Sequence, residues 1–249
     1  MDRAKELLMQ YDNMTFSGDE EREAWLLNIC REYDRSDRDD RCGRASLYNE
    51  LGSFYRNLKK LDQAEAAYRM AIDLMETPVK IGTSQPVCRS CSFEIDCVSI
   101  EGNTDVYTGD YATILNNLAG CYRLQGRTQE ALDTFDRAYL IYASFPDLPK
   151  SLPASCKNNK GLVYLDMNLP EEAEICFREA FKLLEEGHLE GYELAMTYGN
   201  MAVAHYRMGR TEEALKETEQ GLSILKNVTG EDAPVYQGLL RMKQAMEGR

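Results

Sequence analysis

No run of apolar residues in this sequence approaches the roughly 20 that a membrane-spanning helix needs. The opening stretch MDRAKELLMQYDN carries charged residues throughout, so it lacks the uninterrupted apolar segment of a secretory signal peptide. We therefore expect a cytoplasmic protein with no membrane partner.

The sequence also lacks an excess of positive charge. It has 29 lysines and arginines against 42 aspartates and glutamates, which gives a net charge of -13 at pH 7. A protein that binds nucleic acid needs basic residues to neutralise the phosphates. We therefore expect no nucleic-acid partner, and the acidity itself favours solubility.

Catalytic motifs are a third absence. The sequence contains no Gly-x-Ser-x-Gly nucleophile motif, no phosphate-binding P-loop, no His-Glu-x-x-His zinc motif and no second Cys-x-x-Cys pair. Acidic pairs such as Glu171-Glu172 fall where helices are expected to begin, and the helix dipole accounts for them. We therefore predict that the chain is not an enzyme and needs no cofactor.

The sequence does contain a repeated spacing of aromatic and small residues. An anchor residue, three times tyrosine and once His205, is followed by alanine nine positions later. A large residue stands four positions beyond that alanine, and a small residue three positions further on; a weaker fourth copy has threonine at the large position. Because His205 fills an anchor position, we expect it in the core rather than in catalysis. The four copies are Tyr55, Ala64, Tyr68 and Ala71; Tyr122, Ala131, Phe135 and Ala138; Tyr164, Ala173, Phe177 and Ala180; and His205, Ala214, Thr218 and Gly221.

Pairs of closely packed helices account for this spacing. Small residues let two helix axes approach, and tyrosine or phenylalanine fills the hollows beside them. Gly126 and Gly209 suit a helix end that needs a positive φ, while Thr128 and Thr211 suit the N-cap of the next helix. Pro170 suits a first helical turn. Each copy is therefore predicted to be a helix–turn–helix unit.

The pattern resembles the tetratricopeptide repeat, whose signature runs W-x2-L-G-x2-Y and then A-x3-F. Leu51-Gly52 with Tyr55, and Leu118-Ala119 with Tyr122, match its first half. The later anchors lie 42 and 41 residues apart rather than about 34, and the segment ILNNLAGCY resembles the kinesin-light-chain type of repeat. The resemblance implies an all-α, right-handed superhelical α-solenoid with a C-terminal capping helix.

We expect a single solenoid domain over residues 1–249. The interval between the first two anchors is 67 residues, so it contains an insertion relative to the later intervals. The predicted parts are a degenerate N-terminal helix pair at 1–44, repeats at 45–78, 112–145, 154–187 and 195–228, a cysteine-containing insertion at 79–106 and a capping helix at 231–247.

The insertion includes the stretch CRSCSFEIDC, with Cys88, Cys91 and Cys97. A Cys-x-x-Cys turn aims two thiolates at one point, but a structural zinc ion needs four ligands and no second pair stands at a matching distance. Zinc binding, a redox pair and plain loop cysteines stay open, with plain loop cysteines favoured. We therefore predict no metal, and these three cysteines are the candidate ligands if zinc does bind.

In the family that the sequence resembles, the first helix of each repeat lines a concave groove. Asparagine amides there can both donate to and accept from a peptide backbone, arginines can bind acidic groups, and apolar residues in the later repeats can hold a side chain. The groove residues implied by the resemblance are Asn49, Arg56, Asn116, Asn117, Arg123, Asn158, Asn159, Leu162, Leu165, Asn200, Val203, Tyr206 and Arg207.

A second interpretation of these residues stays open, in which the asparagines bond neighbouring helices and the arginines solvate helix ends. The implied function is a non-enzymatic module that binds a protein or peptide partner, as a monomer or weak dimer. Two alternatives are a peptide-sensing regulator of the bacterial type and a metal or thiol switch built on the cysteine insertion.

Overall fold

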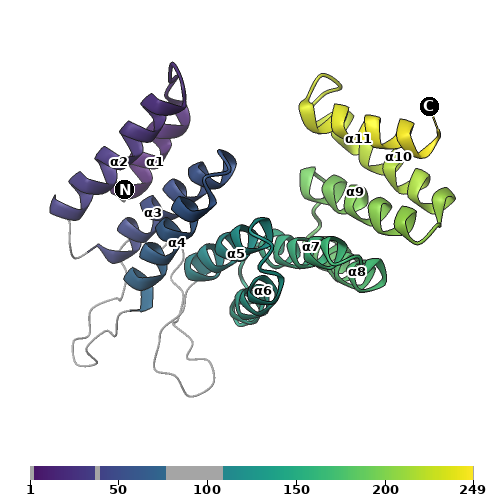
Figure 1. Cartoon of the computed structure of the whole chain (residues 1–249), viewed down its shortest axis with the longest axis horizontal. Coiled ribbons are helices and arrows are strands. Elements are labelled where there is room, and N and C mark those ends of the chain that lie inside the picture. Colours follow the sequence, from purple (N-terminus) through teal and green to yellow (C-terminus); the bar gives the residue numbers. More distant parts are fainter. Residues whose placement is uncertain (1–2, 37–39, 77–108, 249) are drawn as a thin grey trace. The chain divides into compact units, whose positions relative to one another are not determined.

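Eleven α-helices and no strand make up the part of the chain that the computed structural model describes, residues 3–36, 40–76 and 109–248 (Figure 1). The all-α class predicted from the sequence is confirmed. The helices gather into two compact units, Met1–Phe145 and Pro146–Arg249, which we call unit 1 and unit 2. The single domain over residues 1–249 stays a prediction.

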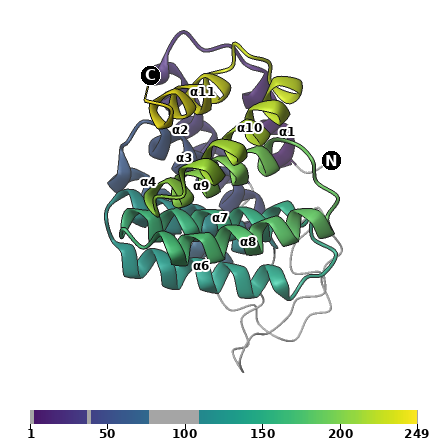
Figure 2. The same ribbon diagram turned by 90° about the vertical axis from the view of Figure 1, so that its right-hand side faces the viewer.

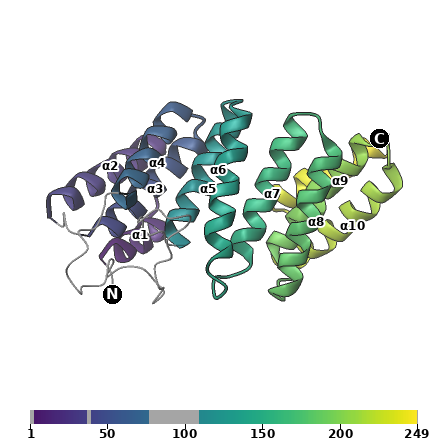
Figure 3. The ribbon, with the colours of Figure 1, turned by 90° about the horizontal axis from the view of Figure 1, so that it is seen from below.

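Unit 1 is built around two antiparallel helix pairs. Helix α3 packs along α4, α5 packs along α6, and α4 contacts α5, while α1 and α2 both contact α3 (Figures 1 and 3). The two pairs overlap the repeats predicted at 45–78 and 112–145. The helices are α1 Arg3–Asn13, α2 Asp19–Ser36, α3 Arg41–Asn57, α4 Leu61–Glu76, α5 Gly109–Leu124 and α6 Thr128–Ala143.

Unit 2 has the same construction with one helix added. Helices α7 and α8 form one antiparallel pair, α9 and α10 form the next, α8 contacts α9, and α11 lies on α10 (Figure 2). The pairs overlap the repeats predicted at 154–187 and 195–228. The helices are α7 Ser151–Asp166, α8 Pro170–Glu186, α9 Tyr192–Arg207, α10 Thr211–Val228 and α11 Pro234–Met246.

The turn inside each of the four pairs has one backbone conformation. The residue four positions after the anchor has a φ between 59° and 77°, and the next residue donates its backbone N–H to the carbonyl of the anchor at 2.8 to 2.9 Å. This bond satisfies a carbonyl that the helix end would otherwise leave open. The predicted helix ends at Gly126 and Gly209 are confirmed, and the same turn recurs at Lys59 and Asn168, which the sequence did not indicate.

The predicted N-caps are wrong by one residue. Thr128 and Thr211 are the first residues of α6 and α10, whereas Arg127 and Arg210 occupy the N-cap positions and no side chain caps either helix. The turn places each arginine immediately before its helix. The guanidinium group bonds carboxylates and does not cap the helix. Pro170 lies in the first turn of α8, as predicted.

Close approach inside the pairs depends on the small residue three positions before the anchor. A Cβ placed on Gly161 of α7 would lie 2.4 Å from the Phe177 ring of α8, and one placed on Gly52 of α3 would lie 2.6 Å from the Tyr68 ring of α4. Both rings are fully buried. The repeat therefore fixes small residues where an aromatic ring lies directly on the backbone of the neighbouring helix.

The predicted capping helix is confirmed as α11. Pro234 lies in its first turn, and its Leu239 side chain enters the notch above Gly199 of α9 and Gly221 of α10. A Cβ at Gly221 would come within 2.9 Å of Leu239, so this notch also depends on small residues. The helix covers the end of the last pair, as the end of a repeat array requires.

We expect Gly161→Ala to lower the free energy of unfolding by about 1–2 kcal/mol, because overpacking against Phe177 outweighs the gain in helix propensity. The control is Gly238→Ala in α11, where a Cβ would meet nothing within 4 Å. Alanine there should stabilise the helix by up to about 1 kcal/mol. Urea unfolding of both variants measures the difference, and equal stabilisation by both would contradict the packing argument.

Candidate functional site

The first helices of the two pairs in unit 1 lie next to each other, and asparagines join them. The Asn117 Nδ2 of α5 donates to the Asn49 Oδ1 of α3 at 2.9 Å. Asn49 and Asn117 are half-buried, whereas Asn116 is buried, with 9% of its surface exposed. The interhelical interpretation of the asparagines therefore holds for this bond, and at most part of each amide faces a partner.

Arg56 lies beside these asparagines, over the smallest residue of the neighbouring helix. A Cβ on Gly120 of α5 would be 3.3 Å from the Arg56 Nη1, so the guanidinium rests on the α5 backbone. The side chain is half-buried, and Arg56 makes no ion pair with any described residue. Burial raises the pKa of the nearby Glu50 carboxyl, and Arg56 opposes this only in part. Arg123, the equivalent arginine of α5, is half-buried as well.

In unit 2 the first helices α7 and α9 are joined by a fully buried polar contact. The Asn158 Nδ2 donates to the Thr197 Oγ1 at 2.7 Å, and the Thr197 hydroxyl donates to the Glu193 carbonyl at 2.8 Å. These two bonds fix the orientation of the amide. The Asn158 Oδ1 is left buried with no hydrogen-bond partner among the described residues, so Asn158 is a structural residue with one open acceptor.

The predicted apolar residues of unit 2 divide into core and surface. Leu165 is 3% exposed and packs in the core with Phe177 and Met201, so it is not available to a partner. Leu162 and Val203 are half-buried against that core, and Tyr206 is 46% exposed.

The predicted polar residues of unit 2 also have different roles. Asn159 of α7 and Asn200 of α9 are half-buried. Arg207 is exposed and donates to the Leu165 carbonyl, which links the end of α9 to the end of α7. Of the predicted residues in unit 2, those that are not buried are Asn159, Leu162, Asn200, Val203, Tyr206 and Arg207.

The structure also reveals a set of charged contacts between successive repeats that were not predicted from the sequence. In unit 1, the Arg127 guanidinium donates to the Glu65 Oε2 at 2.7 Å and makes two further bonds to Glu130. Gln125 and Arg69 also donate to Glu65. Burial acts to raise the pKa of Glu65, but the bonds from Gln125 and Arg127 outweigh it, and the pKa is lowered.

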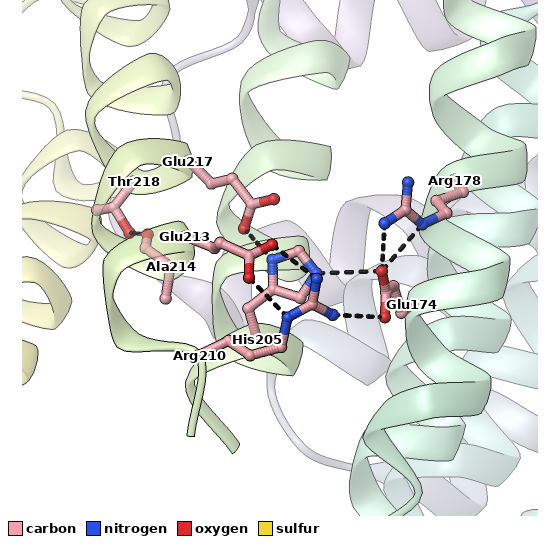
Figure 4. A network of polar contacts seen from close by, with 8 residues as sticks. All are labelled: Glu174, Arg178, His205, Arg210, Glu213, Ala214, Glu217 and Thr218. Atoms are coloured by element: carbon pink, nitrogen blue, oxygen red, sulfur yellow. Dashed lines mark hydrogen bonds and ion pairs between the residues drawn. The ribbon is translucent and has the colours of Figure 1, made fainter. Parts of the chain in front are cut away.

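The same contact recurs in unit 2. We call this contact, in either unit, the junction clamp. The Arg210 guanidinium donates to the Glu174 Oε2 at 3.1 Å and to both oxygens of Glu213 at 2.8 and 2.6 Å (Figure 4). A related contact joins α2 to α3 and to the turn before α4, where the Glu23 carboxylate accepts from the Tyr55 hydroxyl at 3.0 Å and from Lys60 at 2.7 Å. Each clamp joins a carboxylate of one pair to the anchor region of the next.

A sequence signal for the clamp exists. The glutamate directly follows the alanine of one repeat in two copies, Ala64-Glu65 and Ala173-Glu174, and the cation stands five positions after the next anchor. Neither position belongs to the family signature, so only the spacing between copies could have revealed the pair.

His205 is buried at its anchor position, as predicted, and 3% of its surface is exposed. Its Nδ1 lies 2.8 Å from the Glu217 Oε2 of α10, and its Nε2 lies 3.2 Å from the Glu174 Oε1 of α8 (Figure 4). The second contact has an ion-pair distance without the alignment of a hydrogen bond. An open pocket of about 270 Å³ adjoins this cluster, bounded by Arg178 and Lys182 of α8, His205 of α9 and Glu217 of α10.

Within the described ranges, no three histidine, cysteine, aspartate or glutamate side chains are grouped so as to hold a metal ion. Cys88, Cys91 and Cys97, together with the insertion predicted at 79–106, lie outside the described residues. No described helix combines the length and apolarity required to span a bilayer.

Comparison with protein families identifies the repeat. A tetratricopeptide repeat model matches residues 110–186 and 153–227, and a second model of the same repeat matches residues 45–76. Together these matches cover more than half of the sequence, and the chain belongs to the tetratricopeptide repeat family. No curated protein matches the sequence.

Solved structures share the fold at low sequence identity. BtubC (BKLC) from P. vanneervenii is 18% identical with a TM-score of 0.65, over 100% of this chain and 84% of that one. A Podosopora anserina putative kinesin light chain with TPR-like repeats is 14% identical with a TM-score of 0.60, over 91% and 98%. The Rap conjugation gene regulator of the plasmid pLS20, in complex with the Phr* peptide, is 16% identical with a TM-score of 0.60, over 81% of this chain and 47% of that one. These similarities show the fold, and they include the kinesin-light-chain type indicated by the repeat spacing.

We expect Glu65→Gln to lower the free energy of unfolding of unit 1 by about 1–2 kcal/mol, because charge-assisted bonds from Arg127 and Arg69 are lost. The matched control is Asp62→Asn, which removes an exposed charge from the same helix and should change stability by a few tenths of a kcal/mol. Urea unfolding followed by fluorescence of Trp25, the sole tryptophan and part of unit 1, measures both.

The pH dependence of the two forms separates the clamp from simple packing. Because the pKa of Glu65 is lowered in the folded state, its stabilisation is present at neutral pH and is lost as the pH falls through that lowered value. The glutamine variant should therefore approach wild-type stability in acid. A constant difference across the acid range would contradict the electrostatic account.

Proposed function

We propose that this chain is a non-enzymatic interaction module that binds a partner polypeptide along the first helices of its repeats. The observation that carries the proposal is Arg56, a half-buried guanidinium with no ion pair among the described residues. An arginine held partly out of water without an ion-paired carboxylate gains free energy when a partner supplies one. Membership of the tetratricopeptide repeat family supports a protein or peptide as that partner.

In unit 1, the partner would present an acidic group to Arg56 and its backbone to the half-buried amides of Asn49 and Asn117. These two amides already bond each other, so their other polar atoms would make the contacts. Because Gly120 has no side chain, the Arg56 guanidinium can lie close to the α5 backbone. The recognised feature is therefore an extended segment that carries aspartate or glutamate.

In unit 2, the reachable residues are less charged, and the partner would present an apolar side chain. Leu162 and Val203 are half-buried and Tyr206 is 46% exposed, a combination that offers an aromatic anchor beside an apolar floor. The Phr* complex of the Rap regulator, which shares the fold, supports a peptide as a ligand that this kind of helix stack accommodates.

We expect Arg56→Gln to weaken binding of acidic peptides about tenfold to a hundredfold, because a charge-assisted hydrogen bond contributes roughly 1.5–3 kcal/mol. The matched control is Arg241→Gln, which removes the same charge from the exposed surface of α11. Peptides selected on the wild-type chain from a random twelve-residue display library provide the probe, and fluorescence anisotropy measures their affinities for all three proteins.

Selection of peptides rich in aspartate or glutamate, with affinity lost in Arg56→Gln and kept in Arg241→Gln, would support this binding surface. Two results would contradict it. One is a set of selected peptides that both variants bind as tightly as the wild type does, and the other is equal weakening by both variants, which would indicate general charge attraction. Far-UV circular dichroism of each variant ensures that the comparison is made between folded proteins.

A further inference from the structure

The junction clamp of unit 2 contains a histidine where the clamps of unit 1 contain tyrosine. His205 is 3% exposed, and each of its ring nitrogens faces a carboxylate oxygen, Glu217 at 2.8 Å and Glu174 at 3.2 Å (Figure 4). A neutral imidazole has one N–H and one lone pair, so it can donate to only one of two ionised carboxylates. The other nitrogen would then present its lone pair to a negatively charged oxygen.

One additional proton removes this conflict. On the imidazole, it gives a charged ring that faces both carboxylates with N–H groups. On Glu217, it lets the carboxyl donate to Nδ1 while Nε2–H faces Glu174. The two placements are forms of one coupled pair, so the proton belongs to His205 and Glu217 together.

The balance of charges around His205 also indicates one additional proton. Three carboxylates and two guanidinium groups surround the ring, which leaves one negative charge unbalanced. Lys182 and Glu185 also line the adjoining pocket and are opposite in sign. The surrounding groups are Glu174 and Arg178 on α8, Arg210 in the turn before α10, and Glu213 and Glu217 on α10.

Unit 1 provides the internal comparison. Its equivalent clamp consists of Glu65, Arg69, Arg127 and Glu130 around Tyr122, so two carboxylates meet two guanidinium groups. Thr134 occupies the position equivalent to Glu217, twelve residues after the anchor. The charges of the unit 1 clamp are therefore balanced without an added proton. Unit 2 differs from unit 1 because it has histidine in place of tyrosine and glutamate in place of threonine.

We propose that the α8–α9–α10 junction of unit 2 binds one proton, shared by His205 and Glu217, and that release of this proton as the pH rises loosens α9 and α10 from α8. The clamp is then a pH-sensitive device in unit 2 and a pH-insensitive one in unit 1. The proposal concerns the stability of the repeat stack and does not depend on partner binding, so its failure would leave the proposed function untouched.

The direction of the pH effect follows from linkage. Burial raises the pKa of the Glu217 carboxyl, with His205 opposing, so the folded state holds a proton on Glu217 more tightly than the unfolded chain does. That stabilisation is present at low pH and is lost as the pH rises through the folded value. Glu174 acts oppositely: burial tends to raise its pKa, but the bond from Arg178 and the close contact with His205 lower it, so its contribution is lost only in acid.

The pocket beside the pair supplies a route for the proton. It opens between α8 and α10 and is bounded by His205 and Glu217 themselves. Solvent can therefore exchange a proton with the pair without separation of the helices, and the junction can follow the pH of its surroundings.

Hydrogen exchange of the full chain, read by peptide mass spectrometry from about pH 5.5 to 9, tests the proposal. After correction for intrinsic exchange rates, we expect the opening equilibrium constant of α9 and α10 to rise by up to tenfold per pH unit while the proton is leaving. The α5 and α6 segments serve as the reference inside the same molecule and should change less. The double variant His205→Tyr/Glu217→Thr, which reproduces the unit 1 set, should abolish the difference.

A second variant keeps the test decisive if the double variant does not fold. Glu217→Gln keeps the shape of the side chain and can donate to Nδ1 without a titrating proton, so it should also remove the rise of the opening equilibrium constant with pH. His188→Gln, at the other histidine, which is exposed, should leave it unchanged. Parallel pH profiles for the two segments in the wild type, or a rise of opening with pH that survives in Glu217→Gln, would overturn the proposal.

Discussion

The contact on which the rest of the structure depends is an aromatic ring lying directly on the backbone of the neighbouring helix. Phe177 over Gly161 and Tyr68 over Gly52 leave no space for even one methyl group. This close packing fixes where the anchor of the next repeat lies, because the first helix of the next pair packs against the closely packed pair before it. Substituting the small residue would move the helix pair and every contact that the pair positions.

The junction clamp is a consequence of that geometry. The glutamate near the start of the second helix of one pair lies against the next pair. There it is partly removed from water and therefore needs a hydrogen-bond donor. The positive-φ turn supplies one, because it places the residue five positions after the anchor at the N-cap of the next helix. Arg127 and Arg210 leave their helices uncapped and bond Glu65 and Glu174 instead. Local capping is given up for a contact that joins successive repeats.

The sequence predicted the fold well because spacing alone carries it. Tyr122, Ala131 and Phe135 recur at fixed separations, and a helical period converts these separations into a packed face. The candidate site was less predictable, because adjacent positions on a helix differ in direction by about 100° and small shifts decide burial. Leu165 is a core residue, and Asn158 bonds Thr197 from another repeat, a partner that no spacing within one repeat reveals. Pairings between repeats depend on side chains chosen independently in each copy.

The four anchor positions show how one packing site accepts different chemistry. A tyrosine hydroxyl needs only one polar neighbour, and burial raises the pKa of Tyr122, so this anchor keeps its proton through the neutral range. A buried imidazole has two ring nitrogens to satisfy, and Glu217 stands in the copy that has the histidine, where Thr134 stands in the tyrosine copy. The additional carboxylate satisfies the second nitrogen only if a proton comes with it. Unit 2 therefore needs one bound proton, because it has histidine and glutamate where unit 1 has tyrosine and threonine. The repeat fold is the same in both units.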